Sequence, residues 1–424
     1  MNSHDTEKIA GILKGQGYDL IADPESADLI ILNTCSIREK AQHKFYSYLG
    51  YLARLKKKRP SLKIGVTGCI AQQEGNRIHK VNQAVDFSFG SQNVMKLTTL
   101  LNSDSFQAAI EENDLITTTD LPADRDNGIR ALVSIMYGCN NFCSYCVVPF
   151  TRGREKSRPY ENILKEVESL ANNGYKEITL LGQNVNSYNG KCSFPQLLRF
   201  IGKVDGIKRV RFITSHPKDF TVELMLAMKE VEKVCRHVHL PLQSGSTRVL
   251  DLMNRRYNYE TYLEKVKKLK SMIPDIAITT DIIAGFPGEM GEDHALTIKA
   301  LNEIEFDGIF AFKYSKRPGT KATLMDNQVD EGVKSERLQE ILQCQDIITE
   351  RKNKALEDHI IEVLVDGRSE TDPNQWVGRS STNKIINFMM PDDIPENEAK
   401  CIQFLNVRIV KGMRHSLEGE VVRG

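Results

Sequence analysis

The sequence has no long apolar run, and its basic and acidic residues nearly cancel. No segment approaches the about 20 consecutive apolar residues that a membrane-spanning helix needs. The first residues, MNSHDTEK, have no apolar core of the kind that secretory signals carry, so we expect a cytoplasmic protein. With 57 Lys and Arg against 56 Asp and Glu, the net charge of +1 gives no global argument for binding nucleic acid or a membrane. Any argument from charge therefore has to be local.

Internal repeats and the composition of a disordered chain are also absent. Hydrophobic residues make up 40% and charged residues 27%, near the averages for globular proteins. Because 424 residues are too many for one ordinary core, we expect two to four domains. The chain has nine cysteines. Since a reducing cytoplasm disfavours disulfides, they indicate metal or redox chemistry, or ordinary buried thiols.

The first hundred residues alternate between helical and strand patterns. Residues 3–14 and 37–59 have helical character, and the apolar runs 28–35 and 63–69 are typical of buried parallel strands. The two runs end on Cys35 and Cys69. Because ligands gather at the carboxyl ends of strands in open α/β sheets, these two thiols are candidates for one common site.

The remainder of the chain divides by its patterns into three parts. Residues 104–126 are acidic and have no clear period, which favours a linker. Repeated strand and helix patterns between 131 and 315 favour a parallel sheet or partial barrel. A long amphipathic helix is expected at 335–359, and the short strands after it predict a small β-barrel.

The segment GCNNFCSYC places Cys139, Cys143 and Cys146 in one short loop. Thiolates are the normal ligands of iron–sulfur clusters, and three of them leave the fourth iron of a cubane open to a substrate or cofactor. A structural zinc site needs a fourth ligand, usually from a second cysteine or histidine pair, and none follows at zinc-finger spacing. The pattern therefore indicates an iron–sulfur cluster in preference to a zinc site or unrelated thiols.

This cysteine spacing resembles the signature of the radical-SAM superfamily. The resemblance implies a partial (β/α)6 barrel, binding of S-adenosylmethionine to the open iron, and its reductive cleavage to a 5′-deoxyadenosyl radical. It also implies that Tyr145 packs near the adenine of that cofactor. Ile283 and Gly285 resemble the strand of this superfamily that contacts the adenine. Four residues at or just beyond predicted strand ends are further candidates for the cofactor pocket: Gln183, Asn184, Ser215 and Gln243. Each of the six could instead be a structural residue that satisfies loop backbone.

Motifs along almost the whole chain are similar to those of the methylthiotransferases within this superfamily. They include NTCSIREKA, GCIAQQEG, CVVPFTRGREKSRP, LLGQNVNSY, HLPLQSGS and DIIAGFPGE. The resemblance implies an α/β multidomain protein with an N-terminal open-sheet cluster domain at 1–106, a radical-SAM core at 125–357 and a small β-barrel of the TRAM type at 360–424.

Among these motifs, the sequences VVPFTRGREKSRP and TNKIINF are most similar to the tRNA branch of that family. This branch adds a methylthio group to C2 of N6-isopentenyladenosine next to the anticodon. The alternatives are a methylthiotransferase for threonylcarbamoyladenosine in tRNA or for a ribosomal protein, and a truncated, non-catalytic iron–sulfur protein that binds RNA.

The resemblance further implies a second, auxiliary [4Fe–4S] cluster in the N-terminal domain, with Cys35 and Cys69 as two of its three ligands. The family's first ligand would lie two residues before Met1. Three interpretations are open: a start placed on an internal methionine, which we favour, a truncated inactive form, or a cluster with two protein ligands. The remaining candidates match no family ligand and are expected to be ordinary thiols: Cys192, Cys235, Cys344 and Cys401.

The mechanism implied by the resemblance uses two molecules of S-adenosylmethionine. One methylates sulfur bound at the auxiliary cluster, and the other supplies the radical that removes the C2 hydrogen of adenine. The implied partners are the anticodon stem-loop of tRNA and an electron donor such as flavodoxin or ferredoxin. A monomer without membrane contact is expected.

Local basic groups either bind RNA phosphates or form an ordinary solvated surface, and charge alone does not separate the two. One group directly follows the triad, and we expect it to contact substrate: Arg152, Arg154, Lys156 and Arg158. A second group is Lys208, Arg209 and Arg211, and the C-terminal module adds Lys384, Arg408, Lys411 and Arg414. Its aromatic residues Trp376 and Phe388 are expected to pack in a core rather than to stack on bases.

Overall fold

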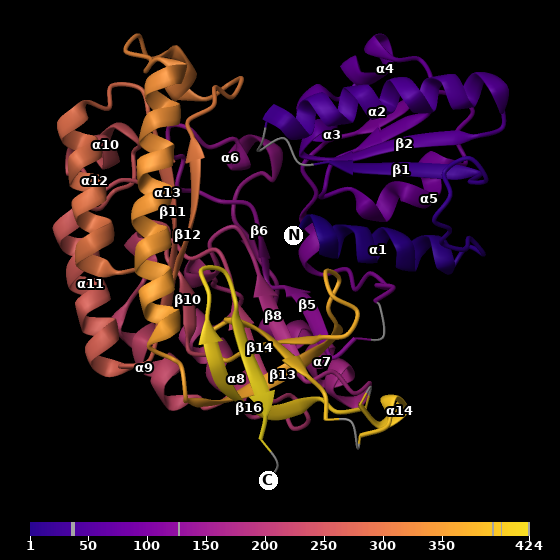
Figure 1. Ribbon diagram of the computed structural model, residues 1–424. Coiled ribbons are helices and arrows are strands. Elements are labelled where there is room, and N and C mark those ends of the chain that lie inside the picture. Colours follow the sequence, from indigo (N-terminus) through magenta and orange to yellow (C-terminus); the bar gives the residue numbers. More distant parts are fainter. Residues whose placement is uncertain (35–38, 126–127, 392–393, 400, 423–424) are drawn as a thin grey trace.

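The structure is a computed structural model that describes residues 1–34, 39–125, 128–391, 394–399 and 401–422. An N-terminal α/β unit lies beside a central half-barrel, and a small closed barrel packs against the lower part of that half-barrel (Figure 1). The predicted α/β multidomain fold is thereby confirmed. Among the described residues, no helix combines the length and the apolar character needed to cross a membrane.

The N-terminal unit is a parallel sheet of four strands in the order β1-β2-β3-β4. Ile64 and Val66 of β2 are fully buried, as expected where helices cover both faces of a parallel sheet. Its elements are α1 Asn2–Lys14, β1 Leu29–Thr34, α2 Glu39–Lys58, β2 Lys63–Gly68, α3 Cys69–Glu74, α4 Arg77–Val81, β3 Phe87–Phe89, α5 Leu97–Leu101 and β4 Gln107–Ala109.

Strand β4 lies inside the segment that we expected to be a linker, so that prediction was wrong for Gln107–Ala109. The strand has only three residues, and it forms because Phe87–Phe89 of β3 offers a parallel edge beside it. Pairing of this kind depends on tertiary context rather than on local pattern.

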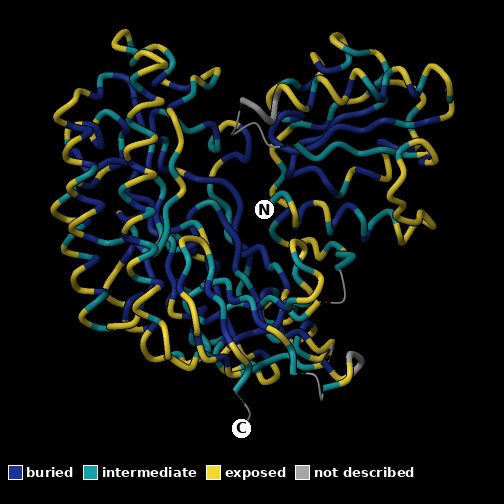
Figure 2. Tube along the Cα trace, in the orientation of Figure 1, coloured by how far each residue is buried: buried dark blue, intermediate teal, exposed yellow. Residues whose placement is uncertain are grey.

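The central unit has six parallel strands in two sheets, β5-β8-β9 and β10-β11-β12, which meet at a parallel bridge between Val210 and Val234. Helices form its outer wall, with their outward faces exposed and the strands behind them buried (Figure 2). Its main elements are β5 Arg130–Ser134, β6 Met136–Tyr137, α6 Val148–Thr151, β7 Lys156–Ser157, α7 Tyr160–Asn172, β8 Glu177–Leu181, α8 Phe194–Gly202, β9 Arg209–Phe212, α9 Val222–Glu230, β10 His237–His239, α10 Thr247–Leu252, α11 Tyr259–Met272, β11 Ala277–Ala284, α12 Gly291–Ile304, β12 Gly308–Lys313 and α13 Glu331–Lys354.

The C-terminal unit is a closed barrel with strand order β13-β14-β15-β17-β16. Trp376 and Phe388 are 2% and 1% exposed, so both aromatic rings pack in the core, as expected. The elements are β13 Ile360–Arg368, β14 Trp376–Ser380, β15 Ile385–Met389, α14 Glu396–Ala399, β16 Phe404–Gly412 and β17 Leu417–Val421.

Two buried arginines of β9 attach this barrel to the central unit. Arg211 donates through Nε to Glu177 Oε2 (2.9 Å) and through Nη2 to the carbonyl oxygen of Ser380 (2.6 Å). Arg209 donates to the carbonyl oxygen of Arg379 and pairs with Glu362, both at 2.7 Å. Both interpretations of these arginines, phosphate binding and a solvated surface, are therefore wrong, because their guanidinium groups are buried between two domains.

Replacing Arg211 with methionine should lower the free energy of unfolding by about 3–5 kcal/mol, because Glu177 would keep a buried and unpaired charge. Urea unfolding followed by circular dichroism measures this. The matched control is Arg236→Met, which breaks an exposed pair with Asp275 and should cost less than about 1 kcal/mol. An equal decrease in the free energy of unfolding of the two variants would contradict the structural role of Arg211.

Candidate functional site

The three cysteines of the triad lie in a loop at the carboxyl edge of β5 and β6. The backbone N–H of Cys139 donates to the carbonyl oxygen of Gly153 (3.2 Å), and that of Cys146 donates to Cys143 (3.0 Å). Ser144 between them donates its N–H to the carbonyl oxygen of Met253. The loop is therefore held by its own turn, by the segment after α6 and by the end of α10.

Burial sets the chemistry of these thiols. Cys139 and Cys143 are 9% and 8% exposed. Burial raises the pKa of Cys139, and it raises the pKa of Cys146 to about 12. These two side chains are therefore neutral thiols at pH 7 until a metal displaces their protons.

Gly138 allows the loop to pass close to the segment after α6. Its φ is +73°, and a Cβ atom at this position would lie 2.1 Å from the carbonyl oxygen of Arg154. The first cysteine can reach its position only because residue 138 has no side chain.

The variant Gly138→Ala should therefore lose most of the iron bound at the triad, because the loop must move away from Arg154. Iron analysis after anaerobic reconstitution measures this. Gly174→Ala is the control, since φ is +90° there and nothing lies within 4 Å of the added Cβ. In that variant, backbone strain should lower the free energy of unfolding by about 1–3 kcal/mol. Its iron content should be unchanged. Equal iron losses in the two variants would contradict the argument.

Two cations lie near the triad: Arg255 approaches a sulfur directly, and Lys218 approaches one through Asn141. Arg255 is buried, and its Nη1 lies 3.3 Å from Cys143 Sγ and 3.5 Å from the hydroxyl oxygen of Tyr145. Asn141 Nδ2 lies 3.4 Å from Cys139 Sγ, and its Oδ1 accepts a hydrogen bond from Lys218 Nζ (2.9 Å). Hydrogen bonds and positive charge of this kind stabilise thiolates and tune the potential of a bound cluster.

Arg255 and Lys218 were not among the residues expected from the sequence to lie at this site. Arg255 belongs to the segment MNRRY, which precedes α11, and Lys218 follows β9. Their position just beyond a strand or helix of the half-barrel could have marked them as candidates for this site. That position does not identify which charged residue reaches a sulfur, because the contact depends on the tertiary fold.

Tyr145 and Ile283 come together in one small apolar group with Phe286. The rings of Tyr145 and Phe286 are 6.3 Å apart, edge to face. Gly285 follows β11 with φ +70°, donates its N–H to Glu289 Oε1 (3.0 Å) and packs against Lys334. Strand β11 therefore ends at Ala284, directly before this glycine.

The polar candidates divide into two kinds. Gln183 Oε1 and Ser215 Oγ are buried and have no hydrogen-bond partner among the residues that the structure describes. In contrast, Asn184 donates to Asp219 Oδ2 (2.7 Å) and accepts from the N–H of His216 (3.1 Å), so its amide joins two loops. Gln243 has φ +72°, and its backbone pairs with β11.

These residues fit a polar cofactor beside an iron–sulfur cluster. Buried polar atoms normally have partners, so the unpaired Gln183 and Ser215 indicate a ligand with hydrogen-bonding groups. His216 contributes a third unpaired atom, Nε2, and burial lowers its pKa to about 2. Within the described ranges, no group of three or more potential ligands is arranged around a single metal ion. A cubane instead takes one thiolate per iron.

Cys69, the candidate ligand of a second site, lies at the carboxyl end of β2, where it begins α3. The side chain is 4% exposed. Asn33 Oδ1 at the end of β1 is buried, lies beside Gly68 and has no hydrogen-bond partner within the part of the chain that is described. This acceptor fits a group with a hydrogen-bond donor near the thiol. Cys35, the other candidate ligand, lies outside the described residues.

The basic group after the triad is mostly turned inward, which contradicts the predicted substrate contact for two of its members. Arg152 and Arg158 are 4% and 5% exposed. Arg158 Nη1 pairs with Glu166 (2.7 Å), and Lys156 pairs with Asp114 (2.8 Å). Only Arg154 of this group is exposed.

Comparison with known families assigns each unit of the chain. Residues 133–301 match the Radical SAM superfamily, residues 1–90 match the Uncharacterized protein family UPF0004, and residues 355–422 match the TRAM domain.

Curated relatives match over the full length. The tRNA-2-methylthio-N(6)-dimethylallyladenosine synthase of Thermodesulfovibrio yellowstonii is 50% identical over 424 residues, covering 100% of this chain and 96% of the relative. The protein of the same name from Clostridium tetani is 47% identical and covers 100% and 94%.

A solved structure shows the same fold at low identity. The radical S-adenosylmethionine methyltransferase TsrM from Kitasatospora setae, with cobalamin and a [4Fe–4S] cluster bound, superposes with a TM-score of 0.57 at 16% identity. The match covers 75% of this chain and 73% of that one.

Proposed function

Because this chain belongs to the family of tRNA-2-methylthio-N(6)-dimethylallyladenosine synthases, we propose that it adds a methylthio group to C2 of N6-dimethylallyladenosine in tRNA. The observation that carries the proposal is the buried loop of Cys139, Cys143 and Cys146 at the carboxyl edge of a radical-SAM half-barrel. The full-length identity of 50% to a curated relative supplies the substrate.

The cofactors of the chain are two [4Fe–4S] clusters and S-adenosylmethionine, which supply a 5′-deoxyadenosyl radical at one site and a methylated sulfur at the other. We assign Cys139, Cys143 and Cys146 to the radical site, and Cys35 and Cys69 to the sulfur site. Radical chemistry suits the target, because the C2–H of adenine is not acidic and carries no leaving group.

The residues around the radical site bind and orient the cofactor. Tyr145 and Ile283 provide an apolar wall for its adenine, while Gln183 and Ser215 offer unpaired polar atoms for its hydrogen-bonding groups. Arg255 holds its guanidinium 3.3 Å from Cys143 Sγ, where it can donate a hydrogen bond to this sulfur. Asn184 and Gln243 fix the loops from which the neighbouring side chains project.

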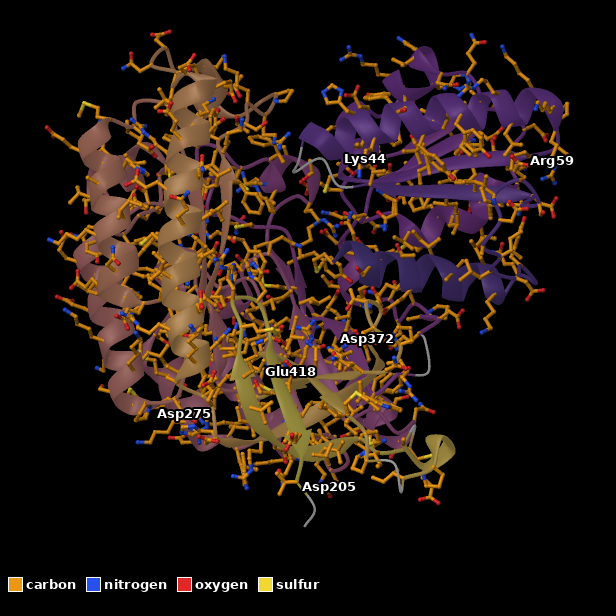
Figure 3. The ribbon with its side chains drawn as sticks, viewed as in Figure 1. Lys44, Arg59, Asp205, Asp275, Asp372 and Glu418 are labelled. Carbon is orange, nitrogen blue, oxygen red and sulfur yellow. The ribbon has the colours of Figure 1, made fainter. Side chains whose placement is uncertain are left out.

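The rim of the radical site has features suited to an RNA loop. Phe150 on α6 is 60% exposed, and its ring lies 6.4 Å from that of Phe142, edge to face. The guanidinium of Arg154 lies 5.7 Å from the centroid of the Phe142 ring. Exposed aromatic rings and cations of this kind stack on bases and contact phosphates. Lys44 is exposed at the end of α2 nearest the half-barrel (Figure 3).

We propose the anticodon stem-loop as the part of tRNA that binds this rim, with exposed Arg408 and Lys411 of the C-terminal barrel as further contacts. Lys384 is less suited, because its side chain is 12% exposed and lies near Asp307. Arg414 pairs with Asp346. A one-electron donor such as flavodoxin or ferredoxin would serve the reductive step in the cytoplasm.

The test is a reaction of the anaerobically reconstituted protein with a reductant, S-adenosylmethionine and tRNA that carries N6-dimethylallyladenosine. Mass spectrometry of the nucleosides should show replacement of one hydrogen by a methylthio group. Parallel reactions contain tRNA with threonylcarbamoyladenosine, tRNA with unmodified adenosine, or ribosomal protein, and these should give no product. Product from one of these and not from dimethylallyladenosine would overturn the assignment.

A further inference from the structure

Arg152 is a buried cation that the radical-SAM core contributes to the Cys69 site. It follows α6, only six residues after Cys146, and is 4% exposed. Helix α6 lies between the half-barrel and α3, the helix that Cys69 begins (Figure 1). The Arg152 side chain therefore comes from the radical-SAM core and extends toward Cys69 in the N-terminal unit.

The guanidinium of Arg152 connects the groups around that cysteine. Its Nη2 lies 2.9 Å from Asp5 Oδ2 and donates to Asn2 Oδ1 at 2.7 Å. Burial lowers the pKa of this guanidinium, but Asp5 and the sulfur of Cys69 raise it above its ordinary value, so the Cys69 side chain lies within range of the Arg152 charge. Nη1 is buried and has no partner within the described part of the chain, so one end of the guanidinium retains free donor capacity.

The backbone of Arg152 is held as firmly as its side chain. Its carbonyl oxygen accepts a hydrogen bond from Gln92 Nε2 of the N-terminal unit (2.5 Å). The next residue, Gly153, accepts the N–H of Cys139 (3.2 Å). One short segment thus contacts the first cysteine of the radical triad through its backbone and places the charge of its arginine within range of Cys69.

We propose that Arg152 is a positioning residue of the sulfur-donating site: it orients the Cys69 thiolate and donates Nη1 to sulfur bound there. The inference rests on the proposed function, since it takes Cys69 to be a ligand of the second cluster. An arginine has five donors in a rigid fork, so it can serve a carboxylate and a sulfur at once. An unpaired buried donor is costly, which argues for an acceptor beside Nη1 in the loaded protein.

Hydrogen bonds to the sulfurs of a cluster and net charge near it set its reduction potential. Donation from Arg152 stabilises the more negative, reduced state, so removing this donor should make the potential of the second cluster more negative. An arginine that only joins two units would leave that potential unchanged. The potential therefore separates a positioning role from a merely structural one.

The experiment uses the full chain with Cys139, Cys143 and Cys146 replaced by alanine, so that only the second cluster can assemble. The test variant adds Arg152→Gln together with Asp5→Asn, which avoids leaving the Asp5 carboxylate unpaired. The matched control adds Arg158→Gln together with Glu166→Gln, since this arginine is as deeply buried as Arg152 but pairs with Glu166 on α7 of the radical-SAM core. Iron content and a redox titration followed by electron paramagnetic resonance are measured for each.

We expect equal iron content in all three proteins, a more negative potential in the Arg152 variant and an unchanged potential in the control. Arg152→Lys keeps the charge and loses the fork, so it should shift the potential in the same direction by less. If the double replacement does not fold, the reduction potential of Arg152→Lys tests the positioning role instead. In the chain with the radical triad intact, the Arg152 double replacement should slow tRNA-independent formation of S-adenosylhomocysteine at least about tenfold and leave 5′-deoxyadenosine formation in place.

Two results would overturn the inference in distinguishable ways. A second cluster that assembles but keeps its potential in both Arg152 variants would show that Arg152 only joins the units, and the proposed function would stand. A background protein that binds no iron would remove Cys69 as a ligand, and the assignment of the sulfur site would fall with the inference.

Discussion

The variant Cys146→Ala should form no 5′-deoxyadenosine from S-adenosylmethionine above the level without enzyme. Cys146 is the last of three thiols in one buried loop, and a cubane with two of its three protein ligands is not expected to hold its open iron in place. Iron per reconstituted chain should fall by about four, the content of one cubane. Chromatography of the nucleoside products and iron analysis measure the two effects.

The control is Cys344→Ala, which removes a partly buried thiol on α13 that contacts neither cysteine site. It should keep both the iron and the 5′-deoxyadenosine. If Cys146→Ala retained cleavage of S-adenosylmethionine at a normal rate, the triad would not be the radical site.

The variant Cys69→Ala should separate the two halves of the reaction. It should yield no methylthio nucleoside, because the thiol at the end of β2 holds the sulfur site in this account. It should still form 5′-deoxyadenosine, because the radical triad lies in the other unit and its loop is held by Gly153 and Met253. Both products are measured in the same reaction.

Cys235→Ala is the matched control for Cys69, because its thiol is 3% exposed against 4% and burial raises its pKa to about 11. Any loss of product from removing a buried thiol as such would appear in both variants. Full methylthio transfer by Cys69→Ala would rule out Cys69 as a ligand needed for sulfur donation.

The grouping of the three candidate cluster ligands could be predicted from the sequence because these residues are local. Cys139, Cys143 and Cys146 occupy eight residues, so their proximity needs no knowledge of the fold. The strands were also predictable, since apolar runs such as Lys63–Gly68 indicate burial on both faces. The short strand Gln107–Ala109 was not, because it depends on an edge that another part of the chain provides.

The burial of Arg152 and Arg211 could not be predicted from the local sequence. A sequence displays the charge of Arg152 or Arg211 but not the partner that buries it. Arg152 meets Asp5 from the start of the chain, and Arg211 binds the carbonyl oxygen of Ser380 near its end. A surface role was the natural expectation for both, and only the tertiary fold shows that each joins two units.

The position of Arg255 was unpredictable for the same reason. It lies more than a hundred residues from Cys143 in the sequence, yet its Nη1 is 3.3 Å from that sulfur. The charge of a cluster ligand sphere is assembled from distant elements, whereas the ligands themselves come from one loop.

The central claim is that one chain holds a radical cluster and a separate sulfur-donating cluster. Its most direct test is quantification of iron and labile sulfide in the anaerobically reconstituted protein. The account predicts close to eight irons and eight sulfides per chain, the content of two cubanes, with about half of each lost in Cys146→Ala. A protein that binds no iron, or iron that is unaffected by replacing Cys146, would contradict it.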